Sequence, residues 1–392
     1  MRRALAARVA ELTAEARESL IQLRRELHRH PELGFGEHRS TARVAEYLRA
    51  AGIEPTMLSP TGAFCDIGTA GAEGRVLLRA DLDALPVRER SGEDFASVNP
   101  GMSHSCGHDL HTAIVAGAAR VLAGLEREGL LRRGVRALFQ PAEEVQPGGA
   151  RHVMEQGVLG GVSRAFALHC DPRVDVGHLG LKEGPITASS DTLRVTLSSD
   201  GGHTSRPHLT GDVVFALGQV ITQTSAVLDR RLDPRNGVSL TWGAVHAGSA
   251  PNVIPEEGVV TGTIRCLDVA VWEIAGPLAA RAIEQLVVPF EVDCVVEHVR
   301  GLPPVLNSVA ETEILAAAAV EALGEGSVVP TEQSLGGEDF AWFLTEVPGA
   351  MGRLGTRTPG GVTYDLHRGD VRFSEDAIEL GVRLLALAAV RD

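Results

Sequence analysis

The stretch SHSCGHDLHTAIVAGAARVLAGLE, residues 103–126, decides the fold class of this chain. Apolar residues such as Ile114, Ala118 and Leu125 recur at helical spacing, so its second half predicts a helix. Its first nine residues, 103–111, are rich in histidine and also contain cysteine and aspartate. The stretch therefore predicts a loop of ionisable side chains that leads directly into a helix.

Short apolar runs on both sides of this stretch predict buried strands. The segment GRVLLRADLDALP (74–86) ends in acidic residues, GVRALFQPAEE (134–144) is stopped by Pro141, and SRAFALHC (163–170) ends in His169 and Cys170. We therefore expect the strand at 165–168 to end at His169. Strands that alternate with helices predict an α/β domain with a mostly parallel sheet and helices on both faces.

The pattern changes near Ala188, where strand and helix signals follow the order β-α-β-β-α-β. This split βαβ order is typical of a small ferredoxin-like α+β domain. Pro277 falls inside its second helix and should kink or restart it. The pattern of the first part then resumes. We therefore expect a discontinuous α/β domain, residues 1–187 and 303–392, with a four-stranded α+β domain inserted at 188–302.

The composition excludes several classes of partner. The chain has 392 residues, with 37 Lys+Arg against 51 Asp+Glu and a net charge of −14. Such an acidic protein is not attracted to nucleic acid or to an anionic membrane, and no apolar stretch is long enough to span a bilayer. The five widely spaced cysteines do not form a disulfide framework. We therefore expect a cytoplasmic protein.

Ionisable residues follow each predicted strand of the first domain. Asp81 and Asp83, the pair Glu143–Glu144, and His169 all come at strand ends. Because ligands bind outside the carboxyl ends of strands in open parallel sheets, these groups should converge with the 103–111 loop. Bringing so many charges together is costly unless a divalent cation compensates them. Carboxylate, imidazole and thiolate ligands suit zinc, and a higher share of oxygen donors suits manganese or cobalt.

The adjacent glutamates Glu143 and Glu144 can take two different chemical roles at one site. One carboxylate can bind a metal, while its neighbour accepts a proton from a water whose pKa the metal lowers toward about 7. The sequence contains no Gly-x-Ser-x-Gly nucleophile elbow. The pattern therefore predicts metal-assisted hydrolysis rather than serine chemistry.

These segments resemble the metal-dependent amidohydrolases, a family that includes hippurate hydrolases, bacterial aminoacylases and plant indoleacetyl-amino-acid hydrolases. The resemblance extends in family order over nearly the whole chain. It is carried by LHRHPELGFGE (27–37), RADLDALPV (79–87), SHSCGHDLHTA (103–113), FQPAEE (139–144), ALH (167–169), GGHTSRPH (201–208), APNVIPEEGVVTGTIR (250–265), GGEDFAWF (336–343) and LHRGDVRFSEDAI (366–378).

The resemblance implies divalent metal ions, two per subunit, with zinc, manganese, cobalt and nickel as candidates. The implied metal ligands come from four segments of the chain and are Cys106, His108, Glu144, His169 and His367. Glu143 matches the general acid/base of the family, and Asp83 matches an acid that orients or tunes the metal site. Asp81 stands where broader relatives have a ligand histidine, and we expect it to lie behind the ligands.

The resemblance also implies that domain 1–187 and 303–392 is the catalytic, metal-binding domain. It implies that the inserted domain, 188–302, is a lid or dimerisation domain that contributes one catalytic residue and two substrate-binding residues. His203 matches a histidine that donates to the oxyanion, often across a dimer interface, so a homodimer is expected. Asn252 and Arg265 match residues that bind the substrate carboxylate. The segment Val145–Pro147 and the extra thiol of Cys170 depart from the family pattern, which leaves the substrate open.

The implied reaction is hydrolysis of the amide bond of an N-acyl amino acid, with release of the carboxylic acid and the free amino acid. Two alternatives remain at this point. A dipeptidase or exopeptidase would use the same metal chemistry on a peptide. A non-catalytic, metal-dependent ligand-binding protein would need no general base, and the intact Glu143–Glu144 pair argues against it.

Overall fold

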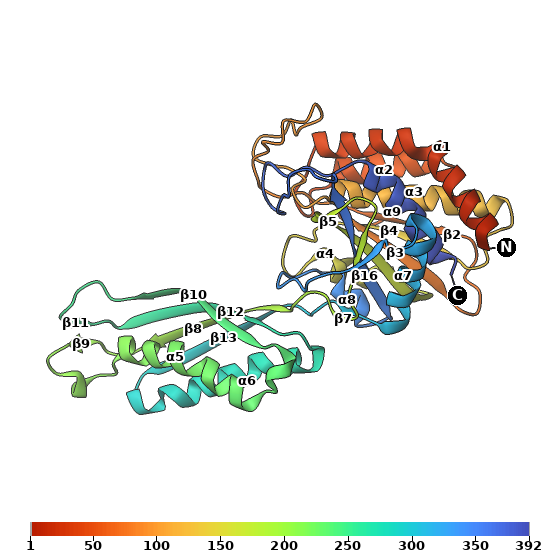
Figure 1. Ribbon diagram of the computed structural model, residues 1–392. Helices are drawn as coiled ribbons and strands as arrows, with labels where there is room; N and C mark the ends of the chain where they lie inside the picture. The colour runs from red at the N-terminus through yellow and green to blue at the C-terminus, as the bar shows by residue number, and fades with distance from the viewer. Residues whose placement is uncertain (1, 392) are drawn as a thin grey trace. The chain divides into compact units, whose positions relative to one another are not determined.

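The computed structural model describes residues 2–391 and contains two compact units (Figure 1). The first unit comprises residues 2–186, 305–332 and 339–391, so the chain leaves it and returns to it. The second unit comprises Thr187–Pro304 and the short segment Gln333–Glu338. The insertion expected at 188–302 lies within this second unit.

The first unit is built on an eight-stranded mixed sheet. Its strand order is β1-β2-β4-β3-β5-β16-β6-β15. The four neighbours β4, β3, β5 and β16 are parallel, whereas β1, β2 and β6 join the sheet through antiparallel pairs. The expected parallel arrangement therefore holds for the centre of the sheet. The strands are β1 (Thr56–Met57), β2 (Ala63–Ile67), β3 (Arg75–Asp81), β4 (Val135–Gln140), β5 (Val162–Asp175), β6 (Leu179–Leu181), β15 (Val328–Pro330) and β16 (Gly349–Arg357).

Helices cover both faces of this sheet, and alternate residues of each strand face the two layers. In β3, Val76 and Leu78 belong to one apolar cluster and Leu77 to the other. The first cluster contains residues of α1 (Arg2–Arg29), α2 (His38–Ala50), α3 (His108–Arg127), α7 (Val309–Leu323) and α9 (Asp376–Ala389). The second contains residues of α4 (Gly149–Glu155) and α8 (Ala341–Leu344). Among the helices of residues 2–391, none is long and apolar enough to cross a membrane.

The strand β5 is longer than its sequence pattern suggested. We expected it to end at His169, but it continues to Asp175. Pairing with β3 stops at Ala167, whereas parallel pairing with β16 continues through His169 and Cys170. Because β16 lies far away in sequence, local patterning could not reveal this extension. His169 still lies where the neighbouring strand β3 has come to its end.

The second unit contains a four-stranded antiparallel sheet with the order β10-β12-β8-β13. Its elements follow the expected β-α-β-β-α-β order along the chain. They are β8 (Ser190–Ser198), α5 (Val213–Arg231), β10 (Ser239–Ala247), β12 (Glu257–Arg265), α6 (Val269–Val287) and β13 (Asp293–Leu302). Short elements complete the described fold: β7 (Gly184–Pro185) pairs with β14 (Leu306–Asn307), β9 (Gly202–His203) pairs with β11 (Val253–Ile254), and three turns, Pro207–Leu209, Pro234–Asn236 and Val288–Phe290, are 3-10 helices.

Pro277 does not restart α6, because the helix continues through it. A kink at Pro277, the other expected outcome, stays a prediction. A proline inside a helix removes the hydrogen bond to the carbonyl four residues earlier, here that of Glu273. Both Pro277 and Glu273 lie on the exposed side of α6. Water can therefore satisfy the carbonyl that the proline leaves unpaired.

Close packing among α1, α3 and α9 gives a stability test at Gly117. A Cβ atom at Gly117 would lie 2.5 Å from Val382 and 2.7 Å from Leu20. We expect Gly117→Ala to lower the stability of the first unit by about 1–3 kcal/mol through overpacking. The control is Gly218→Ala in α5, where a Cβ would meet nothing within 4 Å, and this change should stabilise by about 0.5–1 kcal/mol. Thermal unfolding of both variants measures the difference, and equal stabilisation by both changes would contradict the packing described here.

Candidate metal centre

The ionisable groups predicted to converge do so in the first unit, around the carboxyl ends of its central strands. Cys106 precedes α3, His108 is the first residue of that helix, Glu144 follows β4, and His169 lies in β5. The ligand atoms of Cys106, His108 and His169 all lie within 4.8 Å of one another. Those of Cys106, Glu144 and His367 do so as well. The structure therefore brings together all five ligands that the resemblance implied.

The two groups of ligands share Cys106, and a further group of His108, Glu143 and Glu144 connects them. Two overlapping ligand groups with a shared residue suit a pair of metal ions, since paired ions lie about 3.5–4 Å apart. Cysteine, histidine and glutamate are all ligands that transition metals accept. The donor set therefore fits a dinuclear metal centre.

The ring orientation of two histidines also fits metal binding. Nδ1 of His108 donates to the backbone carbonyl of Asp83 at 2.9 Å, and Nδ1 of His169 donates to the backbone carbonyl of Cys170 at 2.9 Å. In the neutral ring, each Nε2 therefore carries the lone pair. Nε2 of His108 is buried and makes no hydrogen bond, and Nε2 of His169 faces the Cys106 sulfur at 3.5 Å. A backbone carbonyl that fixes the second ring nitrogen is usual for metal-binding histidine.

Asp83 positions the two glutamates through their backbone. Its carboxylate accepts the N–H of Glu143 at 3.0 Å and the N–H of Glu144 at 2.9 Å. The residue before this pair, Ala142, has a φ of 57°, a left-handed conformation that a non-glycine residue adopts at a cost of order 1–3 kcal/mol. The N–H of Ala142 donates to the buried carboxylate of Glu37 at 2.7 Å. Two buried carboxylates therefore hold the turn that carries Glu143 and Glu144.

The electrostatics of the metal-free centre favour the protonated forms of Cys106 and His108, but not that of His169. Burial raises the pKa of the Cys106 thiol well above its usual value, and the carboxylate of Glu144 adds to the effect. Burial alone would lower the pKa of His108, but Asp81 and Cys106 raise it well above the ordinary histidine value. Burial lowers the pKa of His169 far below that value. A metal ion must therefore displace protons from Cys106 and His108, so metal affinity rises with pH.

His111 and Asp81 also lie within ligand distance of His108, but their hydrogen bonds are already committed elsewhere. Nδ1 of His111 donates to the Asp81 carboxylate at 2.7 Å, and Nε2 accepts the backbone N–H of Cys170 at 2.8 Å. The other Asp81 oxygen accepts from Arg79 at 2.7 Å. Both residues therefore support the ligands from behind. Cys170, the cysteine that departs from the family pattern, takes part in this support through its backbone N–H.

One residue that supports the centre had no role assigned from sequence, namely Asp339. Its carboxylate accepts hydrogen bonds from Arg79, from Gln140 at 2.7 Å and from the N–H of Ala150 at 2.9 Å. Its own N–H lies 3.4 Å from Oε1 of Glu143. The motif GGEDFAWF (336–343), which is one of the segments that carry the family resemblance, was the available signal.

The predicted catalytic residue His203 and the predicted substrate-binding residues Asn252 and Arg265 lie in the second unit. His203 pairs with Val253 in the β9–β11 ribbon, and the N–H of Thr204 donates to the carbonyl of Asn252 at 3.2 Å, so His203 and Asn252 are neighbours. Both are exposed, and Nδ1 of His203 accepts the N–H of Ser205 at 3.1 Å. Arg265 ends β12 and donates to the carbonyl of Leu335.

Comparison with known protein families places these features in context. The model of peptidase family M20/M25/M40 matches residues 77–391. N-acetyl-L-cysteine deacetylase of Bacillus subtilis (strain 168) is 37% identical over 341 residues, which cover 86% of this chain and 80% of that protein. A Rhodococcus jostii (strain RHA1) protein that bears the name of a glutamate–cysteine ligase is 45% identical over 97% of this chain. The chain spans only 48% of that relative's length.

A solved structure shares both the fold and the kind of centre. The crystal structure of a dinuclear metal-binding peptidase of the M20 family from Bacillus subtilis superposes with a TM-score of 0.83. The two chains are 33% identical, and the match covers 96% of this chain and 98% of the other. That protein is described as binding two metal ions, which agrees with the two overlapping groups of ligand atoms in this chain.

The contacts of Asp83 generate a prediction about metal affinity. Asp83→Asn replaces one carboxylate oxygen by an amide NH2 group, which cannot accept a hydrogen bond. One of the two backbone N–H groups, that of Glu143 or that of Glu144, therefore loses its acceptor. We expect metal affinity to fall by about 10–100-fold, as it does when outer-shell partners of metal ligands are changed. Titration with a competing chelator measures this loss. The control is Asp175→Asn, which breaks a partly exposed ion pair with Arg357, and an unchanged affinity in Asp83→Asn would contradict the role assigned to Asp83.

Proposed function

The chain belongs to peptidase family M20/M25/M40 and is a metal-dependent amide hydrolase, and from that premise we propose that it hydrolyses N-acyl amino acids. The products would be the carboxylic acid and the free amino acid. The observation that carries the proposal is the placement of Glu143. This carboxylate belongs to the same group of ligand atoms as His108 and Glu144, yet it is not among the five ligands implied by the family.

In this proposal Glu143 acts as the general base and then as the general acid. When bound, the metal ions activate a water molecule and polarise the amide carbonyl. Glu143 takes the proton of that water and later delivers it to the leaving amine nitrogen. Its side chain is only slightly exposed, and Asp83 and Asp339 fix its backbone and one carboxylate oxygen. A base held in this way keeps its direction through both proton transfers.

We assign substrate binding to the second unit. His203 would donate to the oxyanion, for which its Nε2 suits because Ser205 already donates to Nδ1. Asn252 and Arg265 would bind the substrate carboxylate, since a guanidinium group donates to a carboxylate through two parallel hydrogen bonds. We further propose that this unit serves as a lid and as the contact of a homodimer. The exposed edge strands β10 and β13 support a role in pairing.

The names of the relatives suggest which acyl group to test first. Deacetylases of N-acetylcysteine are among them, as is a deacetylase of N-acetyldiaminopimelate, so N-acetyl amino acids are the leading candidates. Peptides remain the second candidate, because the matching family is one of peptidases. A panel of N-acetyl amino acids, N-benzoyl amino acids and dipeptides separates the two. Turnover of dipeptides alone would replace the proposal, and no turnover by the metal-loaded protein would favour a binding protein.

The proposed setting of the enzyme follows from its charge and its thiols. The five cysteines are free, which agrees with the reducing cytoplasm that we propose. The net charge of −14 supports small molecules rather than nucleic acid as partners.

The role of Glu143 can be separated from metal binding by the isosteric change Glu143→Gln. We expect kcat to fall by at least about 100-fold, because general acid–base catalysis contributes roughly 10²–10⁴-fold. Metal content should stay at the wild-type level. Activity assays and elemental analysis of the same samples measure both quantities, with the exposed Glu155→Gln in α4 as control. Loss of metal from Glu143→Gln would make Glu143 a ligand instead.

The role of Arg265 can be tested with matched substrates. Arg265→Ala should raise KM for an N-acetyl amino acid by roughly 10–100-fold, because a hydrogen bond to a charged group contributes about 1.5–3 kcal/mol. The amide of the same substrate, which has no carboxylate, should show the same KM with both proteins. An equal rise of KM for both substrates would mean that Arg265 supports only the structure of its strand.

A further inference from the structure

The proposed base, Glu143, is contacted by a residue at the point where the chain changes unit. The N–H of Asp339 donates to Oε1 of Glu143 at 3.4 Å, and Asp339 belongs to the first unit. The residue directly before it ends a short stretch, Gln333–Glu338, that belongs to the second unit. We call this stretch the connecting segment. A single peptide bond therefore separates the second unit from a contact of the base.

The side chain of Asp339 is fixed within the first unit. Its carboxylate accepts hydrogen bonds from Arg79, from Gln140 at 2.7 Å and from the N–H of Ala150 at 2.9 Å. The N–H that reaches the base is different, because it lies in the planar peptide group shared with the carbonyl of Glu338. The direction of this N–H therefore depends on the connecting segment as well as on the first unit.

The connecting segment is held in the second unit through its backbone. The carbonyl of Leu335 accepts a hydrogen bond from Nη1 of Arg265, although the Leu335 side chain is 62% exposed. A Cβ atom at Gly337 would lie 3.0 Å from Leu302 and 3.6 Å from Ser190, so the segment packs closely on the end of β13 and the start of β8. A displacement of Arg265 would therefore displace the segment.

Arg265 is also the residue that we propose to bind the substrate carboxylate. Its guanidinium group has five N–H donors, and the hydrogen bond to Leu335 comes from Nη1. The other donors suffice for two parallel hydrogen bonds to a carboxylate. A carboxylate bound there would hold in place the same guanidinium group that holds the connecting segment.

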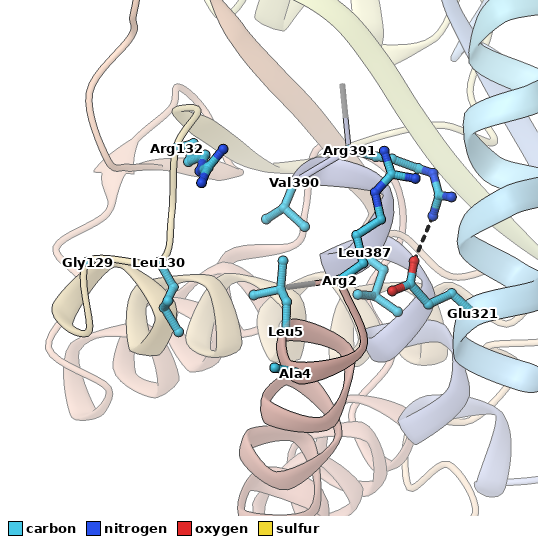
Figure 2. Close-up of a pocket in the computed structure, with 10 residues that line it drawn as sticks. All are labelled: Arg2, Ala4, Leu5, Gly129, Leu130, Arg132, Glu321, Leu387, Val390 and Arg391. Atoms are coloured by element: carbon cyan, nitrogen blue, oxygen red, sulfur yellow. Dashed lines mark hydrogen bonds and ion pairs between the residues drawn. The ribbon is translucent and has the colours of Figure 1, made fainter.

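A cavity elsewhere in the first unit offers no such connection to the base. It has a volume of about 280 Å³ and lies between the first turn of α1, the loop Gly129–Arg132 and the end of α9 (Figure 2). The helix α3 begins at His108 and runs for 20 residues before that loop. At a rise of 1.5 Å per residue, the cavity lies roughly 30 Å along the helix from the metal centre. A ligand in this cavity would not touch Glu143.

We propose that the connecting segment makes the position of Glu143 depend on whether Arg265 holds a substrate carboxylate. The inference rests on the proposed function, from which it takes the roles of both residues. A carboxylate bound to Arg265 fixes the connecting segment, and the segment fixes the N–H of Asp339 on the base. A substrate without a carboxylate does not fix Arg265 in this way. Since a misplacement of about 1 Å can cost roughly 10²-fold in rate, the carboxylate should raise kcat and not only affinity.

One extra glycine inserted between Gly336 and Gly337 tests this coupling. The insertion lengthens the chain between Leu335 and Asp339 by up to ~3.6 Å, so a fixed Leu335 no longer fixes Asp339. The substrates are an N-acetyl amino acid and its carboxamide, in which a neutral CONH2 group replaces the carboxylate. The metal-loaded proteins are assayed for kcat and KM with both substrates, and their metal content and thermal unfolding are measured on the same samples.

Two further variants accompany the insertion. The control carries one extra glycine between Glu325 and Gly326, in the exposed turn after α7. Arg265→Ala removes the hydrogen bond to Leu335 without a change in chain length, so it decides the question if the insertion variant does not fold.

In the wild type and the control, we expect kcat for the N-acetyl amino acid to exceed kcat for the carboxamide at least tenfold. In the insertion variant and in Arg265→Ala, the two kcat values should become similar, while kcat for the carboxamide stays at the wild-type level. An equal fall of kcat for both substrates would indicate a structural role alone and overturn the inference. A wild-type ratio in the insertion variant, or a change of KM alone in Arg265→Ala, would overturn it as well. No turnover of either substrate by the wild type would overturn the proposed function together with this inference.

Discussion

Two backbone N–H groups, those of Glu143 and Glu144, donate to the carboxylate of Asp83, and these hydrogen bonds join the loop after β3 to the turn after β4. The backbone carbonyl of the same Asp83 accepts from His108 and turns its Nε2 toward the other ligands. One residue thus orients a candidate ligand histidine, a candidate ligand glutamate and the proposed base. Without Asp83, the turn at Ala142, which has a left-handed φ, would lose two hydrogen bonds that direct the carboxylates of Glu143 and Glu144 toward one centre.

The parallel centre of the sheet explains why such distant residues meet. β3 and β4 end side by side, and His169 lies in β5 just beyond its last pair with β3. These residues therefore share one edge, and α3 begins there with His108. Burying a thiol, imidazoles and carboxylates together is costly without compensation. The outer network of Arg79, Asp81, His111 and Asp339 satisfies the groups behind the ligands. Bound metal ions would compensate the charge of the ligands themselves, which would couple metal binding to folding.

Much of this centre could be predicted from sequence, because most of the candidate ligands stand in short motifs and several of these motifs directly follow predicted strands. The two adjacent glutamates and the Cys-Gly-His segment indicate a metal site by their residue types and their places after predicted strands. What escaped prediction depends on contacts between distant segments. The continuation of β5 requires pairing with β16, and the role of Asp339 requires Arg79 and Gln140, more than 190 residues away. The uninterrupted helix at Pro277 depends on which side of α6 faces water, and periodicity alone does not settle that.

The central claim is that Cys106 belongs to both ligand groups of a dinuclear centre. Elemental analysis of the purified protein, with wild type beside Cys106→Ala, tests it most directly, and Cys294→Ala serves as a control for loss of a thiol outside the centre. The account predicts nearly two equivalents of a transition metal in the wild type and in the control, and a strong loss from Cys106→Ala. A wild-type protein that retains no zinc, manganese or cobalt after these metals are added would contradict it, as would a full metal content in Cys106→Ala.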